Sequence, residues 1–169
     1  AAAPAPPPGR TIIYADAPEW REVLRSTFTD GPPDPDALEA LKAGAVAALS
    51  RWRGSWSSRP EVVVPLPAAG YGRLTAEIAD HVAGVGRLDK AELTLNPAGF
   101  TDDLSSAEEA KVWRDGIQVD GPAAQAVAGR TVLLLADASS SQWPITVAAA
   151  KLRESGAAAV LPLLIHKRP

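Results

Sequence analysis

The chain has 169 residues, of which 46% are hydrophobic and 22% are charged, and its formal net charge is -3. A chain of this size forms one ordinary globular domain and buries roughly two thirds of its surface. It contains no cysteine and two histidines, which excludes disulfides, cysteine-based zinc sites and a thiol nucleophile and disfavours a histidine-rich metal site. The acidic balance excludes the uniformly positive surface of a dedicated nucleic-acid-binding domain and leaves local basic patches open.

The first ten residues, AAAPAPPPGR, are typical of an extended interdomain linker, because alanine and proline in this proportion build no core. A disordered tail with no domain before it is the alternative. The chain contains no methionine, even at position 1, so we expect a fragment or a processed chain. No apolar run reaches the length of a membrane span and no signal peptide is recognisable, so we expect a cytoplasmic protein without membrane contact.

Residues 11–60 are predicted to form a helical connecting block. Its first helix carries four apolar residues at helical spacing, Trp20, Val23, Leu24 and Phe28. Asp16 is the candidate N-cap of this helix, and Pro35 or Asp36 is expected to open a second one. The apolar stripe of the second helix comprises Leu38, Leu41, Ala45, Ala48, Leu49 and Trp52. Neither stripe is buried by its own helix, so the block should pack on the region after residue 60.

Residues 61–169 alternate strand and helix patterns. The expected strands are EVVVPLP, AELTL, TVLLLAD and AAAVLPLLI, and RLTAEIADHVAGVG is an expected helix. The strands show little polar alternation, which is typical of strands covered on both faces, and the intervening helices imply right-handed crossovers. We therefore predict an α/β domain with a small parallel sheet flanked by helices.

Ligands of such sheets lie beyond the carboxyl ends of the strands, which here points to loops 67–72 and 137–143. The second loop lies within TVLLLADASSSQWPIT, which resembles the diphosphoribose loop of phosphoribosyltransferases: an apolar strand, two acids, three variable residues, Thr or Ser, Gly, any residue and Thr. On that pattern Ala136 stands at the first acid and Asp137 at the second. Ser141 stands at the Thr or Ser, Gln142 at the glycine and Pro144 at the last threonine.

Three of these five positions depart from the pattern. Ala136 removes an acceptor for a ribose hydroxyl, Gln142 places a side chain where backbone approaches phosphate, and Pro144 lacks both a hydroxyl and an N–H. Proline is tolerated in the first turn of a helix, so the fold is kept while anion binding is weakened. We predict a degenerate phosphate and ribose loop without catalytic residues, formed by Asp137, Ser139, Ser140, Ser141 and Thr146. An enzyme that binds a phosphorylated ribose is the alternative.

Two longer stretches carry a second resemblance. ALSRWRGSWSSRPEVVVPLPAAGYGRLTAEIADHVAGVGRL and TVAAAKLRESGAAAVLPLLI are similar to the carboxy-terminal region of RecQ-type ATP-dependent DNA helicases of actinobacteria. In that family a phosphoribosyltransferase-like domain follows the helicase core, and the joining stretch carries tryptophan patterns like those around Trp20 and Trp52. The resemblance implies a nucleoid-associated, non-catalytic accessory domain that engages DNA or partner proteins in DNA repair and recombination.

The motor motifs of that family are missing from the sequence. It has no glycine-lysine-serine/threonine phosphate loop and no Asp-Glu-x-His box, so no ATPase role is assigned to any residue. We expect no cofactor in this chain, and ATP and magnesium only in a helicase core, which the resemblance implies as its partner in the same polypeptide. A purely structural domain that positions this core is a further alternative.

The stretch SRWRGSWSSRP interleaves basic and aromatic side chains. The candidate DNA-binding residues are Arg51, Trp52, Arg53, Trp56 and Arg59. Exposed guanidinium groups contact phosphates, and exposed indoles stack on bases with about 1–3 kcal/mol each. In the other interpretation both indoles are buried and anchor the helical block onto the sheet. Arg73, Arg87 and Lys90 are candidate extensions of the patch, as is the HKRP stretch at residues 166–169.

The segment 96–130 occupies the place of the mobile hood that covers the substrate in transferases of this fold. Its acidic residues are Asp102, Asp103, Glu108 and Glu109, with others further along. They are candidate ligands of a divalent ion, but Ser105 or Ser106 followed by Glu108 or Glu109 is also the spacing of a helix capping box, which we favour. We therefore predict no metal site. Trp113 serves either core packing or partner binding.

Overall fold

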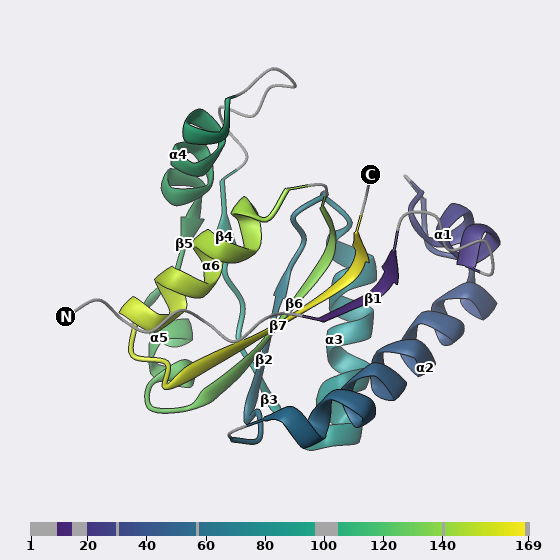
Figure 1. The fold of residues 1–169 in the computed structure, drawn as a ribbon, viewed down its shortest axis with the longest axis horizontal. Coiled ribbons are helices and arrows are strands. Elements are labelled where there is room, and N and C mark those ends of the chain that lie inside the picture. Colours follow the sequence, from purple (N-terminus) through teal and green to yellow (C-terminus); the bar gives the residue numbers. More distant parts are fainter. Residues whose placement is uncertain are drawn as a thin grey trace.

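The computed structural model describes residues 10–14, 20–29, 31–56, 58–96, 105–139 and 141–167 (Figure 1). Its centre is a five-stranded sheet of order β1-β7-β6-β2-β3, in which all pairings are parallel. The strands are β1 (Arg10–Tyr14), β2 (Val62–Leu66), β3 (Asp89–Lys90), β6 (Thr131–Ser139) and β7 (Ala159–Lys167). The predicted α/β class with a small parallel sheet is confirmed.

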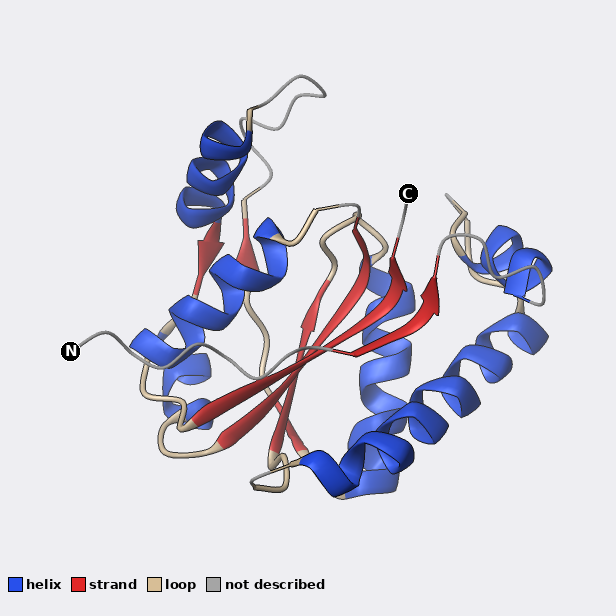
Figure 2. Cartoon of the chain, viewed as in Figure 1, coloured by secondary structure: helices blue, strands red, loops and turns tan. Residues whose placement is uncertain are grey.

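Helices cover both faces of this sheet (Figure 2). One side carries α1 (Arg21–Thr27), α2 (Pro35–Trp52) and α3 (Gly72–Gly86), followed after α2 by the short 3-10 helix η2 (Arg53–Ser55). The other side carries α4 (Ser106–Gly116), α5 (Gly121–Val127) and α6 (Trp143–Glu154), together with the antiparallel pair β4 (Thr94–Leu95) and β5 (Ile117–Gln118). Among the described residues, no helix is long and apolar enough to cross a membrane.

The central strands separate two hydrophobic cores. Val63 and Leu133 face the core under α2 and α3, whereas their neighbours Val64 and Leu134 face the core under α6. All four side chains are almost completely buried. Successive strand residues point to opposite faces, so an unbroken Val/Leu run is stable only when both faces are covered.

Local signals explain where the helices begin. Asp34 caps α2 by accepting a hydrogen bond from the Ala37 N–H at 3.0 Å, and proline stands in the first turn of that helix as predicted. Ser105 and Glu108 form the predicted capping box of α4. The N-cap proposed at Asp16 lies outside the described residues.

Two strand assignments differ from the sequence prediction. β1 lies in the stretch predicted to be linker and helix, and it forms an edge of the sheet beside β7. In the predicted strand AELTL only Thr94 and Leu95 belong to a strand, and they pair with β5 outside the main sheet. The main sheet takes Asp89 and Lys90 instead, because Arg87 ends α3 in the left-handed conformation (φ 55°) and brings the next residues beside β2.

The parallel sheet gives the molecule two chemically different ends. We call the end where β2 and β6 finish, at Leu66 and Ser139, the carboxyl edge; α3 and α6 begin near it, at the top of Figure 1. We call the opposite end, where β2 and β6 start at Val62 and Thr131, the amino edge. α2 and α3 both end there.

Candidate functional site

The acid at the carboxyl edge is bonded within the protein. Asp137 is 0% exposed. Its carboxylate accepts hydrogen bonds from the Ala69 N–H at 2.9 and 3.2 Å, the Tyr71 N–H at 3.0 Å and the Ala138 N–H at 2.7 Å. Burial raises the pKa of Asp137, and these N–H donors partly oppose that shift. The carboxylate therefore fixes loop 67–71 onto β6.

The loop that Asp137 holds depends on one glycine. Gly70 has a φ of 90° and donates from its N–H to the Pro67 carbonyl oxygen at 3.0 Å. A side chain is disfavoured in this left-handed conformation, whereas glycine adopts it readily. The turn directs the N–H groups on either side of Gly70 at Asp137.

The serine turn, Ser139–Ser141, is also bonded within the protein. The Ser139 hydroxyl donates to the Ser141 carbonyl oxygen at 2.6 Å, and the Ser141 hydroxyl donates to Glu109 Oε1 at 2.6 Å. Ser140 lies outside the described residues. Pro144 stands in the first turn of α6 as predicted, and Thr146 is exposed on that helix. The Ser141 hydroxyl, which a phosphate would need as a donor, thus donates to a carboxylate of α4.

Glu109 reaches the serine turn because α4 packs on α6. Its role was not predicted: the two partners are separated by 32 positions, and only tertiary packing joins them. Trp113 of the same helix is 9% exposed and lies in the core under α6, which supports the packing interpretation of this residue. Asp102 and Asp103 lie outside the described residues, and within the described part no group of three or more acids or histidines could hold a metal ion.

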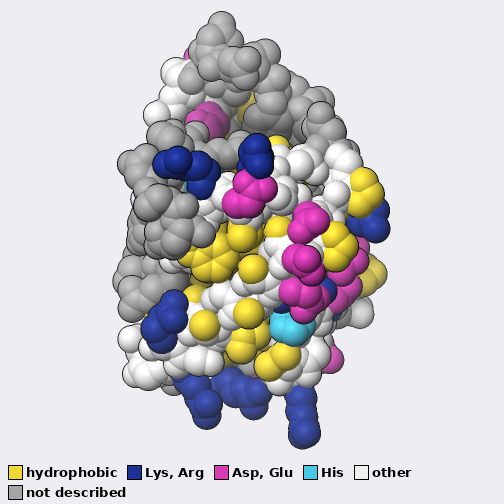
Figure 3. Space-filling model, turned by 90° about the vertical axis from the view of Figure 1, so that its right-hand side faces the viewer, with side chains coloured by type: hydrophobic (Ala, Val, Ile, Leu, Met, Phe, Trp, Pro, Cys, Tyr) yellow, Lys and Arg dark blue, Asp and Glu magenta, His cyan; other side chains and the backbone are white. Residues whose placement is uncertain are grey.

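The amino edge carries a group of four exposed arginines. We call Arg51, Arg53, Arg59 and Arg87 the basic edge; all four are exposed. In Figure 3, Lys and Arg side chains project along the lower rim, whereas Asp and Glu side chains gather higher on the same face. Within the described ranges, none of the four has an ion-pair partner, and Arg59 donates only to the Gly86 carbonyl oxygen.

The two candidate stacking residues differ in exposure. Trp52 is 5% exposed and belongs to the core under α2 and α3, so it anchors the helix and offers no face to a base. Trp56 is half-buried and packs edge-on against Trp52, with ring centroids 5.9 Å apart. Its indole Nε1 is buried and has no hydrogen-bond partner among the described residues.

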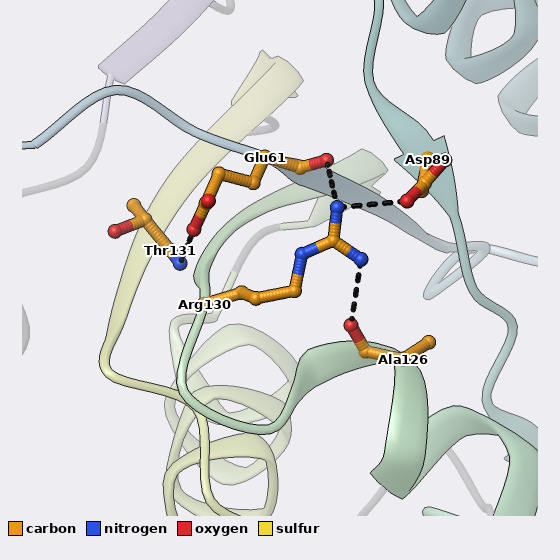
Figure 4. Close-up of polar contacts among 5 residues, drawn as sticks. All are labelled: Glu61, Asp89, Ala126, Arg130 and Thr131. Atoms are coloured by element: carbon orange, nitrogen blue, oxygen red, sulfur yellow. Dashed lines mark hydrogen bonds and ion pairs between the residues drawn. The ribbon is translucent and has the colours of Figure 1, made fainter.

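Other cations near the amino edge are structural. The Arg130 guanidinium donates to Asp89 Oδ2 at 2.7 Å and to the carbonyl oxygens of Ala126 and Glu61 at 3.2 and 3.4 Å (Figure 4). It joins the end of α5 to the starts of β2 and β3. Of the proposed extensions, Lys90 is paired with Asp80 at 2.6 Å, and Arg73 lies at the start of α3, on the carboxyl edge. His166 and Lys167 lie at the end of β7, on the carboxyl edge, and residues 168 and 169 lie outside the described ranges. Of the described candidates, Arg87 alone extends the patch.

Two adjoining hollows mark the basic edge. The first, of about 310 Å³, is lined by aliphatic side chains and by Trp56, Arg53 and Arg59. The second, of about 580 Å³, has a polar lining of three arginines, one acid and two hydroxyl residues: Arg59, Arg87, Arg130, Glu61, Ser58 and Thr131. Arg59, Pro60 and Leu88 line both hollows, so they are contiguous.

Comparisons with known proteins leave the family of the chain open. No protein-family model matches the sequence. No curated protein matches it either. The structure itself defines the class: an α/β protein whose carboxyl edge is bonded internally and whose amino edge carries exposed, unpaired arginines among its described residues.

Proposed function

We propose that this chain is a non-catalytic accessory domain of a RecQ-type DNA helicase, and that its basic edge contacts the phosphate backbone of DNA. The observation that carries the proposal is the exposure of Arg51, Arg53 and Arg87 without ion-pair partners among the described residues. Unpaired surface guanidinium groups gathered at one end attract a polyanion even when the net charge is negative. The helicase assignment rests on the sequence resemblance, which makes DNA the expected polyanion.

The carboxyl edge supports the non-catalytic part of the proposal. A working phosphoribosyl site needs an acid directed at the ribose and donors directed at the phosphate. Here Asp137 accepts from three backbone N–H groups, and the Ser141 hydroxyl is taken by Glu109. Both groups serve the fold.

The test is binding of labelled single-stranded and forked DNA, followed by fluorescence anisotropy across a salt series. The double variant Arg53→Gln/Arg87→Gln removes two charges of the basic edge. The matched control Arg21→Gln/Arg114→Gln removes two exposed arginines from α1 and α4. We expect the first pair to weaken binding roughly 10- to 100-fold and to lower the salt slope by about two, at about one per phosphate contact. Equal effects of both pairs, or no binding at low salt, would refute DNA contact through this edge.

One observation favours the alternative function of binding a phosphorylated ribose. A hollow of about 390 Å³ at the carboxyl edge is lined by Gly70, Gly72 and Arg73 at the start of α3. Calorimetric titration with phosphoribosyl diphosphate distinguishes the two functions. We expect no heat of binding, because the paired acids of the family pattern are reduced to Asp137, which is already bonded to backbone.

A further inference from the structure

The smaller hollow of the basic edge has a composition that phosphate binding alone does not need. Its wall consists of Val46 and Leu49 from α2, Val85 at the end of α3, Leu88, and Trp56 after η2. Val85 is 59% exposed, and it is the exposed large hydrophobic residue of the described part of the chain. At about 310 Å³ the hollow is at the lower end of the range of small-ligand pockets, roughly 300–1,000 Å³.

Polar groups surround this apolar wall. Arg53 and Arg59 line the hollow from η2 and from the segment before β2, and Ser50 adds a hydroxyl from α2. Beyond Arg59 the surface continues into the polar hollow with Arg87. We call this smaller hollow the apolar slot. An apolar slot beside cations suits a polymer in which flat apolar groups alternate with negative charges.

Acidic side chains limit the path of such a polymer. Glu39 and Glu77 form ion pairs with Lys42 midway along α2 and α3, at 3.3 and 3.7 Å, and Asp80 pairs with Lys90. Figure 3 shows Asp and Glu side chains gathered above the lower rim of this face. These three acids outnumber their two lysine partners, so like-charge repulsion disfavours the middle of α2 and α3 as a path for a polyanion.

We infer that the slot receives one unstacked base of a single DNA strand, while Arg53 and Arg59 hold the phosphates on either side. The base would lie against the half-buried indole of Trp56, the type of aromatic platform that single-strand binding proteins use. In duplex DNA the bases are paired and stacked, so the slot would give a preference for single strands. This inference deepens the proposed function and rests on it.

The experiment compares two oligonucleotides of equal length and charge: oligothymidylate and a strand whose sugars carry no bases. Each is titrated against the whole chain, a slot variant and a control. Ser50→Phe fills the mouth of the slot from an exposed position on α2 without changing charge, and Ala47→Phe adds the same ring to an exposed position of α2 that does not line the slot.

We expect oligothymidylate to bind the unmodified chain roughly 5- to 100-fold more tightly than the abasic strand, as one stacked base would give. Ser50→Phe should remove this difference, and Ala47→Phe should keep it. Matching far-ultraviolet circular dichroism and melting of the two variants would show that both are folded.

The outcomes separate this inference from the proposed function. Equal binding of both strands, weakened by Arg53→Gln and unaffected by Ser50→Phe, would overturn the base slot and leave backbone contact standing. No binding of either strand would overturn both. Displacement of oligothymidylate by an acidic peptide ending in a hydrophobic residue, bound more tightly than the DNA, would overturn the slot in favour of a protein partner.

Discussion

The two edges of the sheet use polar residues in opposite ways. At the carboxyl edge Asp137 is fully buried and Ser141 is bonded to Glu109, so the polar groups stabilise the fold. At the amino edge Arg53 and Arg87 are exposed and lack ion-pair partners within the described residues. The difference shows that Asp137 and Ser141 of the carboxyl edge are bonded within the fold, while four arginines gathered at the amino edge are exposed and lack ion-pair partners among the described residues.

The largest expected effect concerns Asp137. Replacing it by alanine leaves the N–H groups of Ala69, Tyr71 and Ala138 without their acceptor. Unpaired buried donors are costly, so we expect a loss of about 2–4 kcal/mol in the free energy of unfolding, measured by urea denaturation. Asp115→Ala, at an exposed position of α4, is the control and should change stability by less than about 0.5 kcal/mol. A loss below about 1 kcal/mol for Asp137→Ala would show that the acid is not structural.

The second prediction separates structural from binding arginines at the amino edge. Arg130→Gln removes the ion pair with Asp89 and weakens the links to two carbonyl oxygens. We expect it to lower stability by about 1–2 kcal/mol and to leave DNA affinity nearly unchanged. Arg87→Gln should lower DNA affinity and leave the free energy of unfolding nearly unchanged. Urea denaturation and fluorescence anisotropy of both variants test this prediction. Similar effects of the two substitutions on stability and on DNA affinity would contradict it.

The third prediction asks whether the carboxyl edge is lost as a site or only covered. Glu109→Gln keeps an acceptor for the Ser141 hydroxyl but removes the charge. We therefore expect the free energy of unfolding to fall by about 1 kcal/mol. The variant should still bind no phosphoribosyl diphosphate in a calorimetric titration, because Gln142 and Pro144 remain. Gain of binding would mean that Glu109 closes a site that is otherwise intact.

The smallest expected effect is the pH dependence of stability conferred by Asp137. Burial raises its folded-state pKa above the ordinary 3.8, so the folded protein holds this proton more tightly than the unfolded chain does. The stability contributed by the protonated group is therefore complete below about pH 4 and is lost as the pH rises through the folded-state pKa. The Asp137→Asn variant has no titratable group at this position. The stability of the unmodified chain minus that of this variant should fall with rising pH, and a rise would contradict the shift.

The features predicted from sequence are those set by local pattern. Unbroken apolar runs predicted β2, β6 and β7, because such runs bounded by turn residues are typical of strands covered on both faces. Helical spacing placed Trp52 on the apolar stripe of α2, and it is buried there. Ser105 and Glu108 were recognisable as a capping box because its spacing is fixed by helix geometry.

The features that were missed depend on contacts between distant residues. β1 follows an Ala/Pro-rich stretch and becomes a strand through its pairing with β7. The sequence identified Asp137 as the remaining acid but could not show that its partners are Ala69 and Tyr71, on a loop that precedes it by more than 60 positions. Stacking and packing were both chemically reasonable roles for the two tryptophans, and burial separated Trp52 from Trp56.

The pairing of β1 with β7 sets an order of events during synthesis. Arg10 lies opposite Leu163, so the strand made first finds its partner about 150 residues later. Closing so long a loop is slow, and contacts of such sequence separation form late in folding. Until residues 159–167 have been synthesised, β1 lacks its partner strand, and Ile13, which is 1% exposed in the finished domain, cannot reach its full burial. The edge of the sheet formed by β1 is therefore one of the last parts of this fold to be completed.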